Sequence, residues 1–219
     1  MPKDTFLNLP EEKRNAITQA AIREFEYHSY DQASVNRIVE EAGIPKGSMY
    51  QYFSHKKDLY KYILSLIVEA KMQYLTPVMT NPFAHPIEVV LRDMFASGLR
   101  FAKEHPHYMR IGNKFIQDKT HPIYLEVMAD NQNRAEQVYE MLLAQAVQRG
   151  ELRKDLDIHF TAHLIFSLSN NLVEYNPDPH QDRWLDTMYE SLEKLLDVLF
   201  LGIRNPYGKA ENNASNTKA

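Results

Sequence analysis

The sequence contains no cysteine, which excludes disulfides, thiolate catalysis and cysteine-ligated zinc. It also lacks long apolar runs: stretches such as Leu66-Ile67-Val68 are only a few residues long, whereas a membrane span needs about 20. Residues 1–14 have no apolar core of the kind that a signal peptide requires. We therefore expect a cytoplasmic protein that does not enter a membrane.

A positive net charge is missing as well. The 219 residues carry a formal net charge of −4, and a bulk negative charge counts against nucleic-acid binding, because contacts to phosphates supply most of the non-specific affinity. Residues 34–62 differ from the whole, since five basic side chains there outnumber three acidic ones. A small basic region on an acidic protein stays compatible with DNA binding.

Glycine is scarce, with seven residues, while 44% of the chain is hydrophobic and apolar side chains recur three and four positions apart. This spacing predicts an all-α protein. Pro10 and Pro45 suit the first position of a helix, Ser34 and Ser54 suit N-caps, and Gly43 suits a left-handed helix end. The expected helices cover residues 10–27, 34–42, 45–51, 55–76, 86–104, 106–117, 122–150, 158–175 and 182–203.

Residues 34–57 form the most informative stretch, because two short helices joined at Gly43 match the helix-turn-helix pattern. Lys46 is a donor at the start of the second helix, and Gly47 would allow a foreign backbone to approach closely. Gln51 could pair with an adenine edge, with Tyr50 offering another large polar side chain. The geometry alone also fits two short helices of an ordinary helical protein.

The residues themselves are more specific than the geometry. Ala42-Gly43, Lys46-Gly47 and the Tyr50–Phe53 run resemble the DNA-binding head of TetR/AcrR-type transcriptional regulators, and the similarity spans about residues 13–64. Val35 departs from the threonine often found at its position, which removes one phosphate hydrogen bond. The resemblance assigns the DNA contacts to Ser34, Val35, Arg37, Lys46, Gly47, Ser48, Tyr50, Gln51, Tyr52 and Lys56.

The resemblance also implies an architecture and a mode of action. Residues 1–71 would be a three-helix DNA-binding head and residues 72–207 a helical body for effector binding and dimerisation. The polar composition of residues 208–219, independently of the resemblance, predicts a disordered tail. The proline-containing segment 76–85 would be the loop between head and body. Such a regulator is a homodimer on a near-palindromic, double-stranded DNA operator, usually a repressor released by a small-molecule effector.

The body offers two candidate surfaces. Aromatic and methionine side chains, together with a polar strip on the helix 158–175, favour a pocket for a lipophilic or aromatic effector; the alternative for each residue is plain core or core edge. The candidate pocket residues are Phe95, Phe101, Tyr108, Phe115, Tyr124, Met128, His163, Phe166 and Asn170. The candidate dimer residues, which could instead be buried within one chain, are Leu164, Leu168, Asn171, Met188, Leu192, Leu195 and Leu199.

Enzymatic motifs are absent from the sequence. His159 and His163 have the spacing of a zinc-binding helix, but Phe160 stands where such motifs place a glutamate. We find no nucleophile elbow and no phosphate-binding loop, and we expect no cofactor and no metal. The rival hypothesis is a helical ligand-binding or scaffold protein without DNA recognition, which the acidic net charge would suit.

Overall fold

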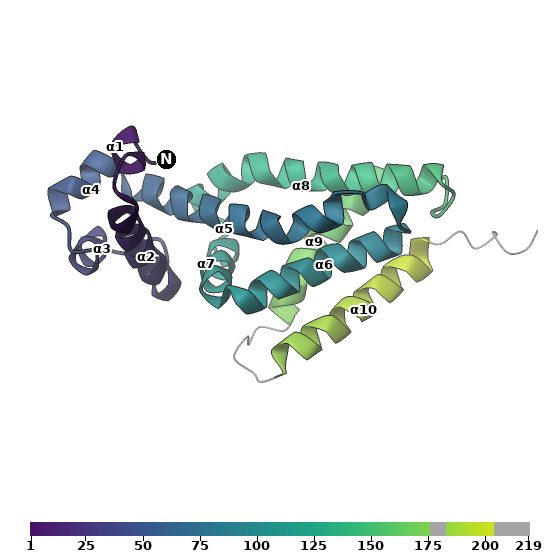
Figure 1. The fold of residues 1–219 in the computed structure, drawn as a ribbon. Helices are drawn as coiled ribbons and strands as arrows, with labels where there is room; N and C mark the ends of the chain where they lie inside the picture. Colours follow the sequence, from purple (N-terminus) through teal and green to yellow (C-terminus); the bar gives the residue numbers. More distant parts are fainter. Residues whose placement is uncertain (176–182, 204–219) are drawn as a thin grey trace, which may run out of the picture. The chain divides into compact units, whose positions relative to one another are not determined.

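The computed structural model describes residues 1–175 and 183–203, and every regular element in that part is helical (Figure 1). The all-α prediction is confirmed, while the predicted tail at 208–219 lies outside the described residues. The elements are α1 (Asp4–Leu7), α2 (Glu11–Tyr27), α3 (Val35–Glu41), α4 (Lys46–Tyr52), α5 (Lys56–Met79), the 3₁₀ turn η1 (Pro82–Ala84), α6 (Ile87–Glu104), α7 (Pro106–Gln117), α8 (Pro122–Gln148), α9 (Ile158–Tyr175) and α10 (Trp184–Ile203).

Several helix starts differ from the predictions. Pro10 and Pro45 precede α2 and α4 with extended backbone, ψ 141° in both, so each occupies the N-cap and not the first helical position. Ser34 is the N-cap of α3, but its hydroxyl makes no capping hydrogen bond. Its backbone N–H donates to Glu24 Oε1 at 2.7 Å instead. The carboxylate from α2 thus satisfies the amide of the N-cap residue itself, and not the amides of Asn36 or Arg37 that the hydroxyl was expected to cap.

The longest helix of the head, α5, corrects two further predictions. Its start is stabilised by Asp58, which accepts a hydrogen bond from the His55 N–H at 3.1 Å, and not by Ser54. The helix then continues through Pro77 to Met79, so the first part of the expected loop is helical. Proline is tolerated there because it removes a single hydrogen bond close to the end of the helix.

The chain folds into two compact units that do not follow the predicted boundary at residue 71. Unit 1 comprises residues 1–74 and 100–130, and unit 2 comprises residues 75–99 and 131–219. The division therefore passes through α5, α6 and α8 and not through a loop. A functional division into head and body stays a prediction, but the structural head is larger than the sequence indicated.

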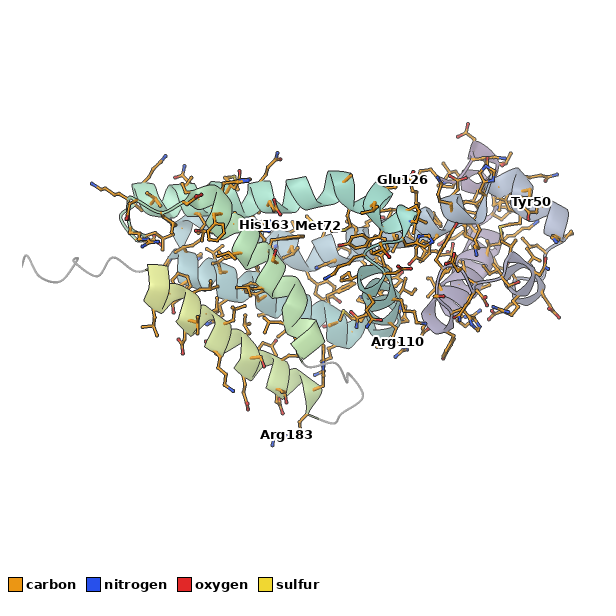
Figure 2. All side chains as sticks on the ribbon, turned by 180° about the vertical axis from the view of Figure 1, so that it is seen from behind. Tyr50, Met72, Arg110, Glu126, His163 and Arg183 are labelled. Carbon is orange, nitrogen blue, oxygen red and sulfur yellow. The ribbon has the colours of Figure 1, made fainter. Side chains whose placement is uncertain are left out.

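Unit 1 includes α7 and the start of α8 because both contribute side chains to the core that the helix-turn-helix also shares. Ile111 of α7 and Ile123 of α8 belong to the same buried core as Phe25 and Ile38. Glu26, only 7% exposed, accepts a 2.6 Å hydrogen bond from Arg110 Nε of α7. Figure 2 labels Arg110 on α7. A buried carboxylate needs such a partner, so this pair fixes α2 against α7.

The start of α8 is tied to α5 within the same unit. Glu126, labelled in Figure 2, receives hydrogen bonds from Lys57 at 3.2 Å and from Lys61. Hydrogen bonds from Lys61 and then Lys57 lower the pKa of Glu126 below its usual value. All three side chains are at the surface, so the cluster adds orientation more than stability.

Unit 2 is built from α6, the later part of α8, α9 and α10. Its buried side chains include Leu91 of α6, Leu142 of α8, Ile165 of α9 and Leu196 of α10. Arg92 of α6 donates to Glu193 of α10 at 2.9 Å, and the Ile87 N–H donates to Glu151 at 2.7 Å. In the described residues, no helix is long and apolar enough to cross a membrane.

Candidate nucleic-acid interface

The turn between α3 and α4 is set by Gly43, whose φ of 64° lies in the left-handed region. Its N–H donates to Glu40 O at 3.2 Å, and the next N–H, of Ile44, donates to Val39 O at 3.0 Å. This is the Schellman arrangement, in which a glycine satisfies the last carbonyls of a helix. Ile44 is buried behind the turn. The prediction for Gly43 is confirmed, and the crossing of the two helices is fixed locally.

Helix α4 has one buried and one exposed face. Met49 is 2% exposed and packs into the core of unit 1, whereas Lys46, Gly47, Tyr50 and Gln51 are exposed. The exposed positions are spaced at i, i+1, i+4 and i+5, so they share one side of the helix. Figure 2 shows Tyr50 at the outer side of α4. These four predicted DNA contacts are therefore presented together.

Gly47 has no steric role within the chain. Its φ is not in the left-handed region, and a Cβ built on it meets no atom of the described residues within 4 Å, apart from its neighbours along the helix. Glycine lowers helix stability relative to alanine by about 0.5–1 kcal/mol. A glycine that the fold does not need, on the exposed face of a helix, is suited to close approach by another molecule.

Arg37, a predicted DNA contact, is held by a buried carboxylate. Its Nη2 lies 2.5 Å from Glu24 Oε1 and 2.9 Å from Gln32 O. Burial acts to raise the pKa of Glu24, but hydrogen bonds from Arg37 and the Ser34 amide outweigh it and hold the pKa below its ordinary value of 4.5. Arg37 is half-exposed, so it can still face phosphate, with its charge partly balanced by Glu24.

Lys56 does not fit its predicted contact with phosphate. Its Nζ donates to Tyr30 O at 2.7 Å, Ala33 O at 3.0 Å and Asp31 O at 3.3 Å, and it lies 4.6 Å from the Tyr30 ring centroid. An ammonium group has three donors, and all are used here. Lys56 therefore stabilises the loop between α2 and α3, a role that its sequence position did not reveal because the loop lies 23 or more residues away.

Two further predicted contacts lie in or beside the core. The Tyr52 side chain is only 6% exposed and its ring centroid lies 6.1 Å from that of Phe6, so its ring packs in the core of unit 1. Val35 is half-buried and packs against the same core. Ser34 and Ser48 are half-buried at the N-terminal ends of α3 and α4. Hydrophobic packing decided these positions, and the motif alone could not show it.

Comparison with known proteins supports this geometry. Residues 17–63 match the family model described as "Bacterial regulatory proteins, tetR family". A solved TetR family transcriptional regulator from Chloroflexus aurantiacus J-10-FL is 31% identical, with a TM-score of 0.71 over 94% of this chain and 99% of that one. The chain belongs to the TetR family. It is thus a transcriptional regulator and not an enzyme.

More distant relatives of this TetR family member are regulators too. The transcriptional repressor AcnR of Corynebacterium glutamicum is 24% identical over 150 residues, covering 68% of this chain and 73% of AcnR. The fatty acid metabolism regulator protein of Bacillus subtilis is 22% identical over 205 residues, covering 86% and 94%. These similarities extend beyond the helix-turn-helix, so they include the helical body.

The predicted effector-pocket residues of the regulator are divided between the two units. Phe101, Tyr108, Phe115, Tyr124 and Met128 belong to unit 1, whereas Phe95, His163 and Phe166 belong to unit 2. The side chain of Asn170 lies outside the described residues. Within unit 1, Phe101 is 3% exposed and stacks on Tyr108 at 6.3 Å. That pair fits the alternative of plain core.

Unit 1 also contains a small cavity, of about 40 Å³. Phe115 and Tyr124, both predicted pocket residues, line it together with Tyr60. Burial raises the pKa of Tyr60, which keeps its hydroxyl protonated. Pockets for drug-sized ligands have volumes of roughly 300–1,000 Å³. This cavity is therefore too small, as it stands, for the expected effector.

The predicted dimer residues divide between core and surface. Met188 and Leu192 are each 2% exposed in unit 2, so the prediction that they face a partner is wrong. Leu164, Leu195 and Leu199 are half-buried and Leu168 is exposed, while the Asn171 side chain lies outside the described residues. Other exposed apolar side chains on α9 and α10, which were not predicted to lie at the interface, include Phe160 at 57%, Val198 at 71% and Leu201 at 78%.

Two histidines of α9 contact carboxylates of α8. His159 Nδ1 lies 2.5 Å from Glu140 and His163 Nδ1 lies 2.9 Å from Glu136, so two parallel pairs connect the helices of unit 2 (Figure 2 labels His163). No group of three or more histidine, aspartate or glutamate side chains that could hold a metal occurs in the part of the chain that the structure describes.

Proposed function

We propose that the protein is a cytoplasmic, homodimeric repressor that binds a near-palindromic operator and is released by a small lipophilic or aromatic effector. The exposed face of α4 carries this proposal. Lys46, Tyr50 and Gln51 offer a cation and two polar side chains on one side of a helix, the arrangement that helix-turn-helix proteins insert into the major groove. Their roles would be contact with phosphate for Lys46 and contact with base edges for Tyr50 and Gln51.

Gly47 supplies the sharpest support, because the fold does not require glycine there. On DNA, the bare backbone of α4 would lie against the sugar-phosphate chain, where a methyl group has no room. Ser34, Ser48 and Arg37 at the adjoining helix ends would hold the phosphates on either side. Two such heads, related by two-fold symmetry, would reach half-sites about 34–36 Å apart.

Gly47→Ala tests the proposal without disturbing the fold. The operator is first located by footprinting on the DNA upstream of the protein's own gene. Gly47→Ala should then lower operator affinity by about tenfold or more, equivalent to about 1.4 kcal/mol. Gly98→Ala in α6 is the matched control, because its Cβ also meets no described atom within 4 Å. Both variants should retain the wild-type melting temperature or exceed it.

A double variant gives the complementary result. Lys46→Ala with Tyr50→Ala should abolish the gel shift and leave the dimer intact, since both side chains are exposed and outside the core. Retained binding would contradict the site assignment. If wild-type protein binds no duplex at any salt concentration, the rival hypothesis of a helical ligand-binding or scaffold protein replaces the proposed one.

The proposal for the effector depends on composition and on relatives. The body contributes apolar side chains with few polar anchors, and the Bacillus subtilis relative, at 22% identity, is named for fatty acid metabolism. A ligand that alters the separation of the two heads would misalign one of them on the operator. A screen for compounds that both raise the melting temperature and release the operator tests this. Ligands that stabilise the protein but never release DNA would contradict it.

A further inference from the structure

The segment before the helix-turn-helix contacts the end of the recognition helix. In Figure 1, α1 lies beside α4. The Lys3 N–H donates to Tyr52 O at 2.9 Å, and Lys3 Nζ donates to Tyr50 O at 2.8 Å. The Thr5 hydroxyl donates to Gln51 O. Three consecutive carbonyls at the C-terminal end of α4 thus each accept a hydrogen bond from residues 3 and 5.

These carbonyls are the ones that a helix cannot satisfy by itself, because the last four C=O groups lack partners within the helix. Helix α4 has seven residues, so its last turn is a large part of it. The residues on that turn include Tyr50 and Gln51, which the proposed function places against base edges. The arm formed by residues 3–7 therefore holds the half of α4 that would read DNA.

Phe6 anchors the arm to the core. Its side chain is 0% exposed, and its ring centroid lies 4.8 Å from Phe53 and 5.3 Å from Tyr62. Phe53 directly follows α4, and Tyr62 lies on α5. Burial of this ring keeps Lys3 and Thr5 in register with the carbonyls of α4, so the contacts do not depend on an exposed segment finding its place.

We propose that Lys3 and Thr5 are positioning residues for sequence-specific DNA recognition, which rests on the proposed function of α4. They act through α4: by fixing its last turn, they hold Tyr50 and Gln51 in the geometry that base contacts need. Contacts to phosphate position a protein without reading sequence. Loss of the arm's hydrogen bonds should therefore reduce the discrimination between operator and other DNA more than it reduces general DNA affinity.

Thr5 offers a matched pair of substitutions. Thr5→Val keeps the shape and removes the donor, whereas Thr5→Ser keeps the hydroxyl. Losing one hydrogen bond should lower the ratio of operator affinity to scrambled-duplex affinity about three- to tenfold in Thr5→Val, and Thr5→Ser should restore it. Thr80→Val is the control, because its exposed hydroxyl bonds only to Thr76 O, outside unit 1.

Lys3→Met separates positioning from direct contact with DNA. If Lys3 contacts a phosphate, Lys3→Met should lower the slope of log affinity against log salt concentration by about one. If Lys3 only positions α4, Lys3→Met should leave that slope unchanged and lower the discrimination between operator and scrambled DNA. Fluorescence anisotropy on operator and scrambled duplexes, over a series of salt concentrations, measures both. A reduced slope for Lys3→Met with unchanged discrimination overturns the proposal in favour of direct contact with phosphate.

Hydrogen exchange tests, without DNA, whether the arm stabilises the last turn of α4. The Phe53 N–H donates to Met49 O at 2.9 Å and belongs to the turn that the arm holds. Exchange of this amide should rise in Thr5→Val and stay unchanged in Thr5→Ser and Thr80→Val. If the wild type prefers operator over scrambled DNA and Thr5→Val shows the same preference, the role of the arm is overturned but the proposed function of α4 is not. If the wild type itself shows no preference between the duplexes, the proposed function and the role of the arm in recognition are both overturned.

Discussion

The exposed faces of α4 and α9 have opposite chemistry, although both belong to helices of the same all-α chain. Helix α4 in unit 1 presents Lys46, Tyr50 and Gln51 around a bare glycine backbone. Helix α9 in unit 2 presents Phe160 and Leu168, eight positions apart on one side, with half-buried Leu164 midway between them. A polar, cationic face suits a hydrated phosphate backbone, and an apolar stripe suits another protein surface.

The contrast supports the proposal that DNA binding and self-association use surfaces of different chemistry. Binding to DNA should depend on charge, and therefore on salt, because it releases counterions. Self-association through the stripe of α9 and the exposed Val198 and Leu201 of α10 should depend on burial of apolar area. Substitutions that act on one face without the other test this separation.

The largest effect is expected from charge on the apolar stripe. Phe160→Glu with Leu168→Glu should convert the dimer to monomer, and operator affinity should fall at least 100-fold because two half-sites are no longer bound together. Sedimentation equilibrium and anisotropy measure the two effects. Leu125→Glu is the control, since Leu125 is 58% exposed but lies in unit 1. A double variant that remains dimeric would remove α9 from the interface.

The next largest effect is expected from salt, which should weaken DNA binding through α4 but not self-association through α9. Lys46→Ala is expected to reduce the slope of log affinity against log salt by about one per contacting head and to weaken binding to all sequences alike. The dimer should persist at salt concentrations that release DNA, because apolar burial does not weaken with ionic strength. An unchanged slope in Lys46→Ala would show that Lys46 does not contact phosphate.

Glu24 should control the stability of the head in acid. Because the pKa of Glu24 is lowered in the folded protein, its contribution to the free energy of unfolding is fully present above about pH 4.5. That contribution is lost as the pH falls through the pKa of the folded state. Glu24→Gln should cost about 1–2 kcal/mol of unfolding free energy at pH 7, because Arg37 and the Ser34 amide lose a charged partner. Urea unfolding at pH 7 and pH 4 should show the gap between variant and wild type narrowing.

Exposed Glu69 supplies the control for that experiment, because Glu69→Gln makes the same chemical change on α5 without a buried carboxylate. An equal loss of stability in both variants would show that the Glu24 network does not stabilise the head.

The smallest effect concerns His159, which is exposed. The hydrogen bond with Glu140 raises the pKa of His159 above its ordinary value of 6.5. The pair's contribution is present below pH 6.5 and is lost as the pH rises through the raised value. His159→Gln should therefore lower the melting temperature slightly at pH 6 and not at pH 9. His85→Gln, at another exposed histidine, serves as control, and an equal shift in both would exclude the pair as the cause.

Local patterns in the sequence determined more of α4 than of the body. The left-handed Gly43 and the exposed Lys46, Gly47, Tyr50 and Gln51 follow from spacing within a dozen residues, so they were predictable. The pocket and dimer assignments depended on how distant helices meet, and several were misplaced for that reason. Met188 and Leu192 have the same hydrophobic character as Phe160 and Leu168, and burial alone distinguishes them.

The sequence by itself determined the helical class, the positions of nine of the helices to within about three residues and the motif of a TetR family regulator, because these depend on neighbours three or four positions apart. Only the tertiary structure decided that Lys56 serves the α2–α3 loop, that Tyr52 is core, and that Glu24 orients Arg37. It alone showed that residues 3–7 complete the end of α4. Partners separated by ten to nearly fifty residues leave no periodic signal, since folding, and not spacing, brings them together.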